Sequence, residues 1–282
     1  MTEVVQGLDA IADRYDGFVF DQYGVLHDGN HLYPNVVAVL RGLRERGKPA
    51  LVLTNSGRGA GYNLRRLSGL GLHENLIDHV VTSGDVAKYH LLPRTIQDVG
   101  PNCYCIASDD SERRDLFLSV DGLIEADSPD QCDFVYLSGM AAGLAETWQS
   151  DLLPALLAAN VPLLCSNPDY VAPGKAGLTT SPGTIAKAYR DGGGTVELVG
   201  KPYPLIYDLV RTRLDGMKCR NPLFIGDSYD HDIVGAHNAG FDALLVLSGI
   251  HREFFEDHDI KQTAVDELIK GGPPPTWISR TL

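Results

Sequence analysis

The chain has 282 residues and a net charge of −13 at pH 7; 44% of its residues are hydrophobic and 22% are charged. This composition is typical of a globular protein with one large domain or two modest ones, because a domain usually contains roughly 100–200 residues. The acidic balance argues against nucleic acids and membranes as partners, and no apolar run approaches the roughly 20 residues needed to span a bilayer.

The first 15 residues contain an early acidic residue and no long apolar stretch, so we expect no secretory signal there. The five cysteines form none of the CxxC pairs that are typical of zinc sites, and three of them lie in apolar strand-like runs. We therefore expect reduced thiols and a cytoplasmic location.

Apolar strand-like runs alternate with helical patterns along most of the chain, which predicts a parallel sheet covered by helices. In the first third of the chain we expect strands at 18–20, 50–53 and 79–82, and helices at 34–46 and 58–67.

The pattern changes near Ser83, where a second α/β module begins. It contains strand-like runs at 103–107, 134–137 and 163–165, a helix at 145–159, and a glycine-rich hinge at 191–194. The buried-strand pattern of the first module then resumes at 196–199, 223–225 and 243–247. We therefore predict a core formed by 1–83 and 196–282, an inserted domain at 84–195, and a turn-rich tail on the surface.

Polar residues follow four of these strands at their carboxyl ends, where open parallel sheets bind ligands. Phosphoryl transfer requires a nucleophile, cationic and N–H donors for the phosphoryl oxygens, and carboxylates for Mg²⁺. Each feature alone is more often a cap or a turn, and only the combination indicates this chemistry. The four strand exits are Asp21, then Thr54 with Asn55, then Lys201, and finally Asp227 followed by Asp230 and Asp232.

With these motifs the chain resembles the haloacid dehalogenase (HAD) superfamily, and within it subfamily IIA, the NagD-like phosphatases. The resemblance implies a Rossmann-like α/β core with a parallel sheet, and a large α/β cap inserted between the second and third motifs. It covers nearly the whole chain. The matching segments are DQYGVLHDG from Asp21, LTNS from Leu53, VGKP from Val199, GDSYDHDIVGAHNAG from Gly226 and LVLSGI from Leu245.

The resemblance implies a catalytic role for Asp21 as the nucleophile that forms an aspartyl-phosphate. It also implies that Mg²⁺ is bound by Asp21, Asp227 and the backbone carbonyl of Tyr23. Asp232 would orient the shell of metal ligands, and Lys201 would neutralise Asp21.

The same resemblance implies that phosphate is bound by Thr54, by the amide of Asn55 and by Lys201. A closing cap would exclude bulky partners, so we expect a small phosphorylated metabolite as substrate. Since related enzymes often dimerise through the cap, a homodimer is compatible with the resemblance.

Tyr23 departs from the family pattern, which has a second aspartate at this position. The lost carboxylate would protonate the leaving group and later activate water, and such help typically contributes about 10²–10⁴-fold. Three interpretations remain open: a slow or specialised phosphatase, a catalytically impaired phosphate-binding or sensing protein, or an enzyme in which another residue supplies the base. His27, Asp169 and Tyr170 are the candidates for that base.

Overall fold

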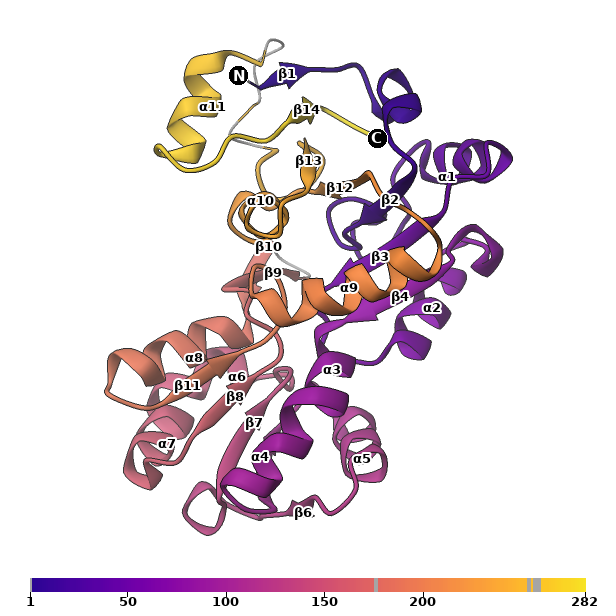
Figure 1. Cartoon of the computed structure of the whole chain (residues 1–282). Coiled ribbons are helices and arrows are strands. Elements are labelled where there is room, and N and C mark those ends of the chain that lie inside the picture. Colours follow the sequence, from indigo (N-terminus) through magenta and orange to yellow (C-terminus); the bar gives the residue numbers. More distant parts are fainter. Residues whose placement is uncertain (1, 175–176, 253–254, 256–259) are drawn as a thin grey trace. The chain divides into compact units, whose positions relative to one another are not determined.

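The computed structural model describes residues 2–174, 177–252, 255 and 260–282. It contains two compact units. The core unit comprises Met1–Thr54, Gly61–Val81 and Lys201–Leu282, and the insert unit comprises Asn55–Ala60 and Thr82–Gly200. The predicted α/β fold is confirmed, because each unit contains its own sheet of parallel strands (Figure 1).

The core unit is built on a seven-stranded sheet in the order β1-β14-β13-β12-β2-β3-β4. Its central strands are apolar and buried on both faces, as expected for a parallel sheet covered by helices. The strands are β1 (Glu3–Val4), β2 (Gly17–Phe20), β3 (Ala50–Thr54), β4 (His79–Thr82), β12 (Pro222–Gly226), β13 (Asp242–Val246) and β14 (Trp277–Ser279).

The helices of the core unit present apolar faces to this sheet. In α1, the residues Val36, Val39, Leu40 and Leu43 recur with helical spacing and join the main apolar cluster. The helix begins later than predicted because Asn35 has φ 70°, which is not helical. The helices are α1 (Val36–Glu45), α2 (Ala60–Gly69), α9 (Pro204–Gly216), α10 (Val234–Asn238) and α11 (Gln262–Ile269), with a π-helical turn at Tyr229–Ile233.

The insert unit has a five-stranded parallel sheet in the order β11-β8-β7-β5-β6, with a separate antiparallel pair, β9 and β10. Its strands are β5 (Asn102–Ile106), β6 (Ile124–Glu125), β7 (Phe134–Leu137), β8 (Leu163–Cys165), β9 (Val171–Gly174), β10 (Gly177–Thr180) and β11 (Val196–Leu198). Its helices are α3 (Ser83–Val86), α4 (Leu92–Asp98), α5 (Asp110–Ser119), α6 (Leu144–Thr147), α7 (Leu153–Ala159) and α8 (Pro182–Asp191).

The structure corrects the placement of one predicted strand and of the tail. The run at 196–199 was expected in the core sheet, but β11 pairs with β8 in the insert sheet. The tail was expected on the surface, but β14 lies between β13 and β1 with Trp277 and Ile278 buried. Both strands are three residues long, which is too short for their apolar pattern to reveal a pairing partner.

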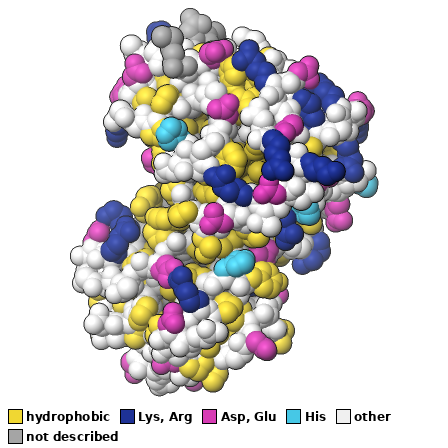
Figure 2. Space-filling model, viewed as in Figure 1, with side chains coloured by type: hydrophobic (Ala, Val, Ile, Leu, Met, Phe, Trp, Pro, Cys, Tyr) yellow, Lys and Arg dark blue, Asp and Glu magenta, His cyan; other side chains and the backbone are white. Residues whose placement is uncertain are grey.

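Several basic side chains of the core unit are paired with acidic ones. Figure 2 shows Lys and Arg over α1 and α2, with Asp and Glu among them. Arg44 lies 3.3 Å from Asp78, and Arg46 lies 2.8 Å from Asp9. Among the described residues, no helix is long and apolar enough to cross a membrane.

Candidate functional site

Two neighbouring strands of the core sheet end in carboxylates. β2 pairs with β12 in parallel, and the backbone N–H of Asp21 extends the ladder by donating to the Ile225 carbonyl at 2.8 Å. Asp227 follows β12 directly. The carboxyl ends of parallel strands lie at the same edge of the sheet. Asp21 and Asp227 are therefore brought together, although they are 206 positions apart in the chain.

Asp232 completes a group of three carboxylates at this edge. It lies on the π-helical turn after β12, and the N–H of Ser228 donates to its Oδ2 at 3.0 Å. One oxygen from each of Asp21, Asp227 and Asp232 lies within 4.8 Å of the other two. We call these three residues, with Lys201, the carboxylate cluster.

Lys201 is the cation of this cluster. Its Nζ donates to Asp21 Oδ1 and to Asp232 Oδ1, both at 2.6 Å, and the residue is only 3% exposed. Burial acts to lower the pKa of Lys201, but the two carboxylates outweigh burial and raise it, so the side chain is an ammonium. The predicted partnership of Lys201 with Asp21 is therefore present, and Asp232 shares it.

With all three carboxylates ionised, the cluster would hold more negative than positive charge. Burial is the main cause that raises the pKa of Asp21 to about 7; Asp232 adds to the rise and Lys201 opposes it. Burial also raises the pKa of Asp227 well above its usual range, followed by the charges of Asp21 and Asp232. Three carboxylates facing one ammonium are poised to accept a further cation.

Two glycines that are not among the predicted site residues allow the backbone to approach Asp227 closely. A Cβ on Gly24, which has φ +81°, would lie 2.1 Å from Asp227 Oδ2, and one on Gly249 would lie 1.8 Å from it. The N–H of Ile250 donates to the same oxygen at 2.8 Å, and the Ser248 hydroxyl donates to the Gly24 carbonyl at 2.6 Å. The signal in the sequence was a fifth strand exit, Ser248–Gly249 after β13.

Tyr23 lies in the turn that follows Asp21, which we call the Tyr23 loop (residues 22–31). Its hydroxyl donates to the backbone carbonyl of Asp28, and its ring stands edge-on to His27 with the ring centroids 5.1 Å apart. Gly29 has φ +103°, and a Cβ there would lie 2.5 Å from the phenol oxygen. Burial, and then the charge of Asp28, raise the pKa of Tyr23. The phenol is thus bound within its own loop.

His27 is fully buried in the same loop. Its Nδ1 accepts the N–H of Gly29 at 2.9 Å, so the proton of the neutral ring is on Nε2, which lies 3.2 Å from the Gln22 amide. Burial and then Arg66 lower the pKa of His27 to about 4. Among the described residues Gln22 Oε1 has no partner, and rotation of this amide by 180° would let it accept the Nε2 proton. His27 therefore supports the loop and is not an exposed base.

The second motif is divided between the two units. Thr54 is buried at the end of β3 in the core unit, whereas Asn55 belongs to the insert unit. There the side-chain amide nitrogen of Asn55, Nδ2, donates to Asp169 Oδ1 at 2.7 Å, which leaves the backbone N–H of Asn55 out of this bond. Tyr170 follows Asp169, and its carbonyl accepts the Thr184 hydroxyl at 2.6 Å.

Comparison with known proteins gives matches over most of the chain. Residues 18–115 match the family described as haloacid dehalogenase-like hydrolase, and residues 198–271 match a second family described as HAD-hydrolase-like. The D-glycerol 3-phosphate phosphatase of Mycobacterium tuberculosis is 27% identical, over 96% of this chain and 77% of its own.

Two solved structures are similar in fold. A haloacid dehalogenase-like hydrolase from Brucella suis 1330 has a TM-score of 0.81 and 27% identity, with 99% of both chains covered. The glycerol phosphate phosphatase of Mycobacterium tuberculosis in complex with magnesium has a TM-score of 0.70 and 23% identity, covering 96% of this chain and 77% of its own.

Proposed function

The chain belongs to the haloacid dehalogenase-like hydrolases, and from this premise we propose that it is a Mg²⁺-dependent phosphatase acting on a small phosphorylated metabolite. The observation that carries the proposal is the ammonium of Lys201, 2.6 Å from both Asp21 and Asp232, beside Asp227. The named activity of the mycobacterial relative, removal of phosphate from glycerol 3-phosphate, supports the substrate class.

The proposed nucleophile is Asp21. One of its carboxylate oxygens attacks phosphorus, the bond to the leaving oxygen breaks, and that oxygen keeps the electron pair and takes up a proton. Water then attacks the aspartyl-phosphate, gives up a proton, and releases inorganic phosphate and the free carboxylate. Lys201 holds Asp21 in place and supplies positive charge to the phosphoryl oxygens.

The residues of the carboxylate cluster fit Mg²⁺. Carboxylate oxygens are its preferred protein ligands, and burial together with the neighbouring carboxylates raises the pKa of Asp227, a cost of ionisation that a divalent ion would offset. Asp21, Asp227 and the Tyr23 carbonyl would hold the ion. Asp232 would orient these ligands without binding the ion itself. When bound, Mg²⁺ neutralises charge on the phosphoryl oxygens.

Phosphate binding is assigned in the same proposal to the Thr54 hydroxyl, the Asn55 amide and Lys201. Support from the core unit comes from the position of Thr54 at the end of β3, next to the strand that leads to Asp21. A hydroxyl, an N–H and an ammonium are the donors that a phosphoryl group requires.

Proton transfer is the step for which Tyr23 is poorly suited. Its hydroxyl already donates to the Asp28 carbonyl, and its pKa is raised, so the phenol is neither a free acid nor a base near neutral pH. We therefore propose low activity on alkyl phosphates, whose leaving oxygen needs a proton. Aryl and acyl phosphates need none and would turn over faster.

The test compares an aryl phosphate with an alkyl phosphate of similar size, with Mg²⁺ and with EDTA, for the wild type and Asp21→Asn. We expect Mg²⁺-dependent turnover that favours the aryl substrate by about 10²-fold or more, and loss of turnover in Asp21→Asn. Equal rates on both substrates would contradict the role assigned to Tyr23, and an active Asp21→Asn would contradict the nucleophile.

The bond of the Tyr23 hydroxyl to the Asp28 carbonyl also favours a second candidate function. This is a phosphate-binding or sensing protein whose aspartyl-phosphate hydrolyses slowly. Incubation with a small acyl phosphate should then leave a long-lived phosphoenzyme that is stable to acid and labile to base. Rapid release of phosphate without an accumulating phosphoenzyme would eliminate this candidate.

A further inference from the structure

The loop Asn55–Ala60 directly follows β3 of the core unit, yet it belongs to the insert unit. At its start, Asn55 bonds to Asp169; at its end, the N–H of Ala60 donates to Asp85 Oδ2 at 2.7 Å. The loop is therefore fastened to the insert unit at both ends.

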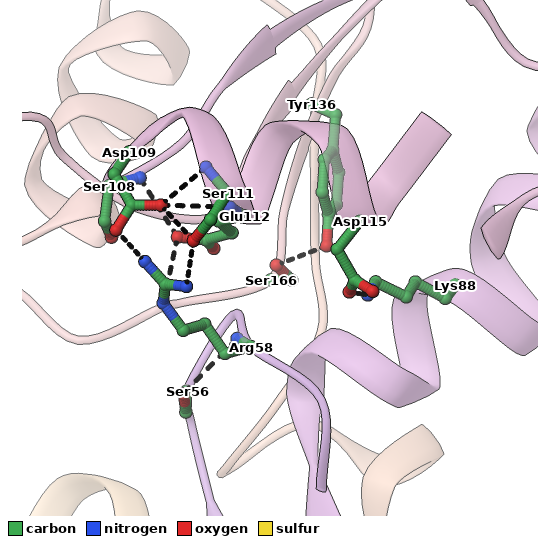
Figure 3. Close-up of polar contacts among 10 residues, drawn as sticks. All are labelled: Ser56, Arg58, Lys88, Ser108, Asp109, Ser111, Glu112, Asp115, Tyr136 and Ser166. Carbon is green, nitrogen blue, oxygen red and sulfur yellow. Dashed lines mark hydrogen bonds and ion pairs between the residues drawn. The ribbon is translucent and has the colours of Figure 1, made fainter. Parts of the chain in front are cut away.

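Arg58 fastens the middle of this loop. Figure 3 shows its side chain extending from the loop to the start of α5, where it meets several oxygens. Its guanidinium donates to Asp109 Oδ2 and, at 3.1 Å, to Ser111 Oγ, and its Nε lies 3.7 Å from Glu112 Oε2. The Arg58 side chain is only 13% exposed, whereas the Asp109 side chain is 54% exposed, so the guanidinium is largely buried while its acidic partner meets solvent.

The carboxylates that receive Arg58 are themselves held rigidly. Asp109 Oδ1 caps α5 by accepting the N–H groups of Ser111 and Glu112, at 2.9 and 3.0 Å. Bonding to Ser111 and then to the Glu112 N–H, with a smaller contribution from Arg58, lowers the pKa of Asp109 to about 2. Glu112 Oε2 accepts the N–H of Ser108 at 3.0 Å. Arg58 is thus attached to the first turn of a helix and not to a mobile side chain.

The loop also packs closely against other segments of the insert unit. A Cβ on Gly57 would lie 2.4 Å from the Ser138 carbonyl oxygen, and one on Gly84 would lie 2.0 Å from the Gly57 oxygen. The Ser56 carbonyl accepts both the Gly84 N–H and the Ser83 hydroxyl, each at 3.1 Å. Within the described part of the chain, Glu112 Oε1 and Ser138 Oγ are buried without a partner.

We propose that Arg58 is a positioning residue that locks the loop Asn55–Ala60 to α5, so that the insert unit controls how the loop's N–H donors bind phosphate. The proposal rests on the function assigned above, in which the Asn55 amide is a phosphate donor. Arg58 itself needs no contact with the substrate. It acts by holding the backbone that presents Asn55, and phosphate affinity thereby depends on an ion pair within the insert unit.

The first measurement is the dissociation constant of inorganic phosphate, by calorimetry on the full chain with saturating Mg²⁺. We expect Arg58→Ala to raise it by about tenfold, which corresponds to 1.4 kcal/mol. Arg58→Lys should restore part of the affinity, since an ammonium keeps the charge but not the guanidinium fork. Asp109→Asn, which keeps the helix cap and removes the charge, should cause a smaller rise and serves if Arg58→Ala does not fold.

Arg113→Ala is the matched control. Arg113 lies on the same helix and forms ion pairs with Asp110 and Glu125, but it makes none with the loop. Its replacement should leave phosphate affinity unchanged. For an aryl phosphate, Arg58→Ala should raise KM more than it lowers kcat, a division that general loss of stability would not produce.

Hydrogen exchange at the amides of the loop separates this inference from the proposed function. Arg58→Ala should speed exchange at 55–60 while the strands of the core sheet keep their protection. Faster exchange with unchanged phosphate affinity would overturn the control of binding, and unchanged exchange would overturn the lock itself. A wild type that neither binds nor releases phosphate would refute the proposed function, while the exchange experiment would still decide whether Arg58 holds the loop.

Discussion

Asp21 of the carboxylate cluster directly precedes the Tyr23 loop in the sequence, yet the polar groups of the cluster and of the loop are used in opposite ways. In the cluster, three carboxylates lie together with one ammonium that bonds to two of them, so their full ionisation would leave negative charge unbalanced. In the loop, the Tyr23 hydroxyl bonds to Asp28 and His27 accepts from Gly29, so these groups satisfy one another. Unbalanced buried charge is costly unless a ligand compensates it, whereas a satisfied network stabilises a conformation. The cluster is therefore suited to chemistry and the loop to support.

The largest effect is expected from replacing Lys201, the cation of the cluster. We expect Lys201→Met to destabilise the metal-free protein by roughly 3–5 kcal/mol, because it leaves buried carboxylates without their partner. The free energy of unfolding by urea in EDTA would measure this loss.

Lys187→Met is the control for that experiment, since Lys187 forms an exposed ion pair with Asp191 on α8. Its loss should change stability by less than about 1 kcal/mol. If Lys201→Met proved as stable as the wild type, the carboxylates would not carry the charge that the comparison assigns to them.

The pH dependence of stability would sharpen the comparison. The pKa of Asp21 is raised to about 7 in the folded protein, mainly by burial, while an unfolded aspartate titrates near 3.8. The folded state therefore binds the proton more tightly, and stability should rise as the pH falls through 7 toward 4. From Asp21 alone we expect a gain of about 2 kcal/mol between pH 7.5 and 5.5 in EDTA.

Saturating Mg²⁺ should remove this dependence, because a bound cation favours the charged carboxylates at every pH in that range. Urea unfolding in parallel series with EDTA and with Mg²⁺ would reveal the difference. Stability that fell on acidification in EDTA would show that the cluster is already balanced.

The sequence was sufficient to predict the cluster because each of its strand exits can be identified from a short stretch of residues. Asp21 and Asp227 each follow an apolar run long enough to identify as a buried strand, and the carboxyl ends of parallel strands meet at one edge. Lys201 was also predicted, although the run before it, now β11, pairs in the other sheet. Lys201 does follow a strand, as predicted, but that strand belongs to the insert sheet and not to the core sheet.

Contacts between distant segments could not be predicted in this way. Asn55–Ala60 groups with the insert unit, and one of the contacts that join them is between Arg58 and Asp109, which are 51 positions apart. The short strand β14 is buried only because β1 and β13 flank it. The Tyr23 hydroxyl lies 2.5 Å from where a Cβ on Gly29 would be, and the sequence does not specify which side chain the missing Cβ accommodates.

Replacing Tyr23 is the most delicate test of the comparison. Tyr23→Phe removes the bond to the Asp28 carbonyl and should reduce stability by about 1 kcal/mol. The pH–rate profile on an aryl phosphate should keep its shape, because the phenol does not exchange a proton with the substrate.

Tyr189→Phe is the matched control: it removes a hydroxyl bonded to the Val161 carbonyl at 2.7 Å in the insert unit, with a similar loss of stability and no change in rate. A loss of about 10²-fold in kcat for Tyr23→Phe, with one limb of the profile removed, would instead make the phenol the acid or base. Tyr23→Asp tests whether the chain lacks a group for proton transfer. If it does, a carboxylate at this position should raise the rate on alkyl phosphates.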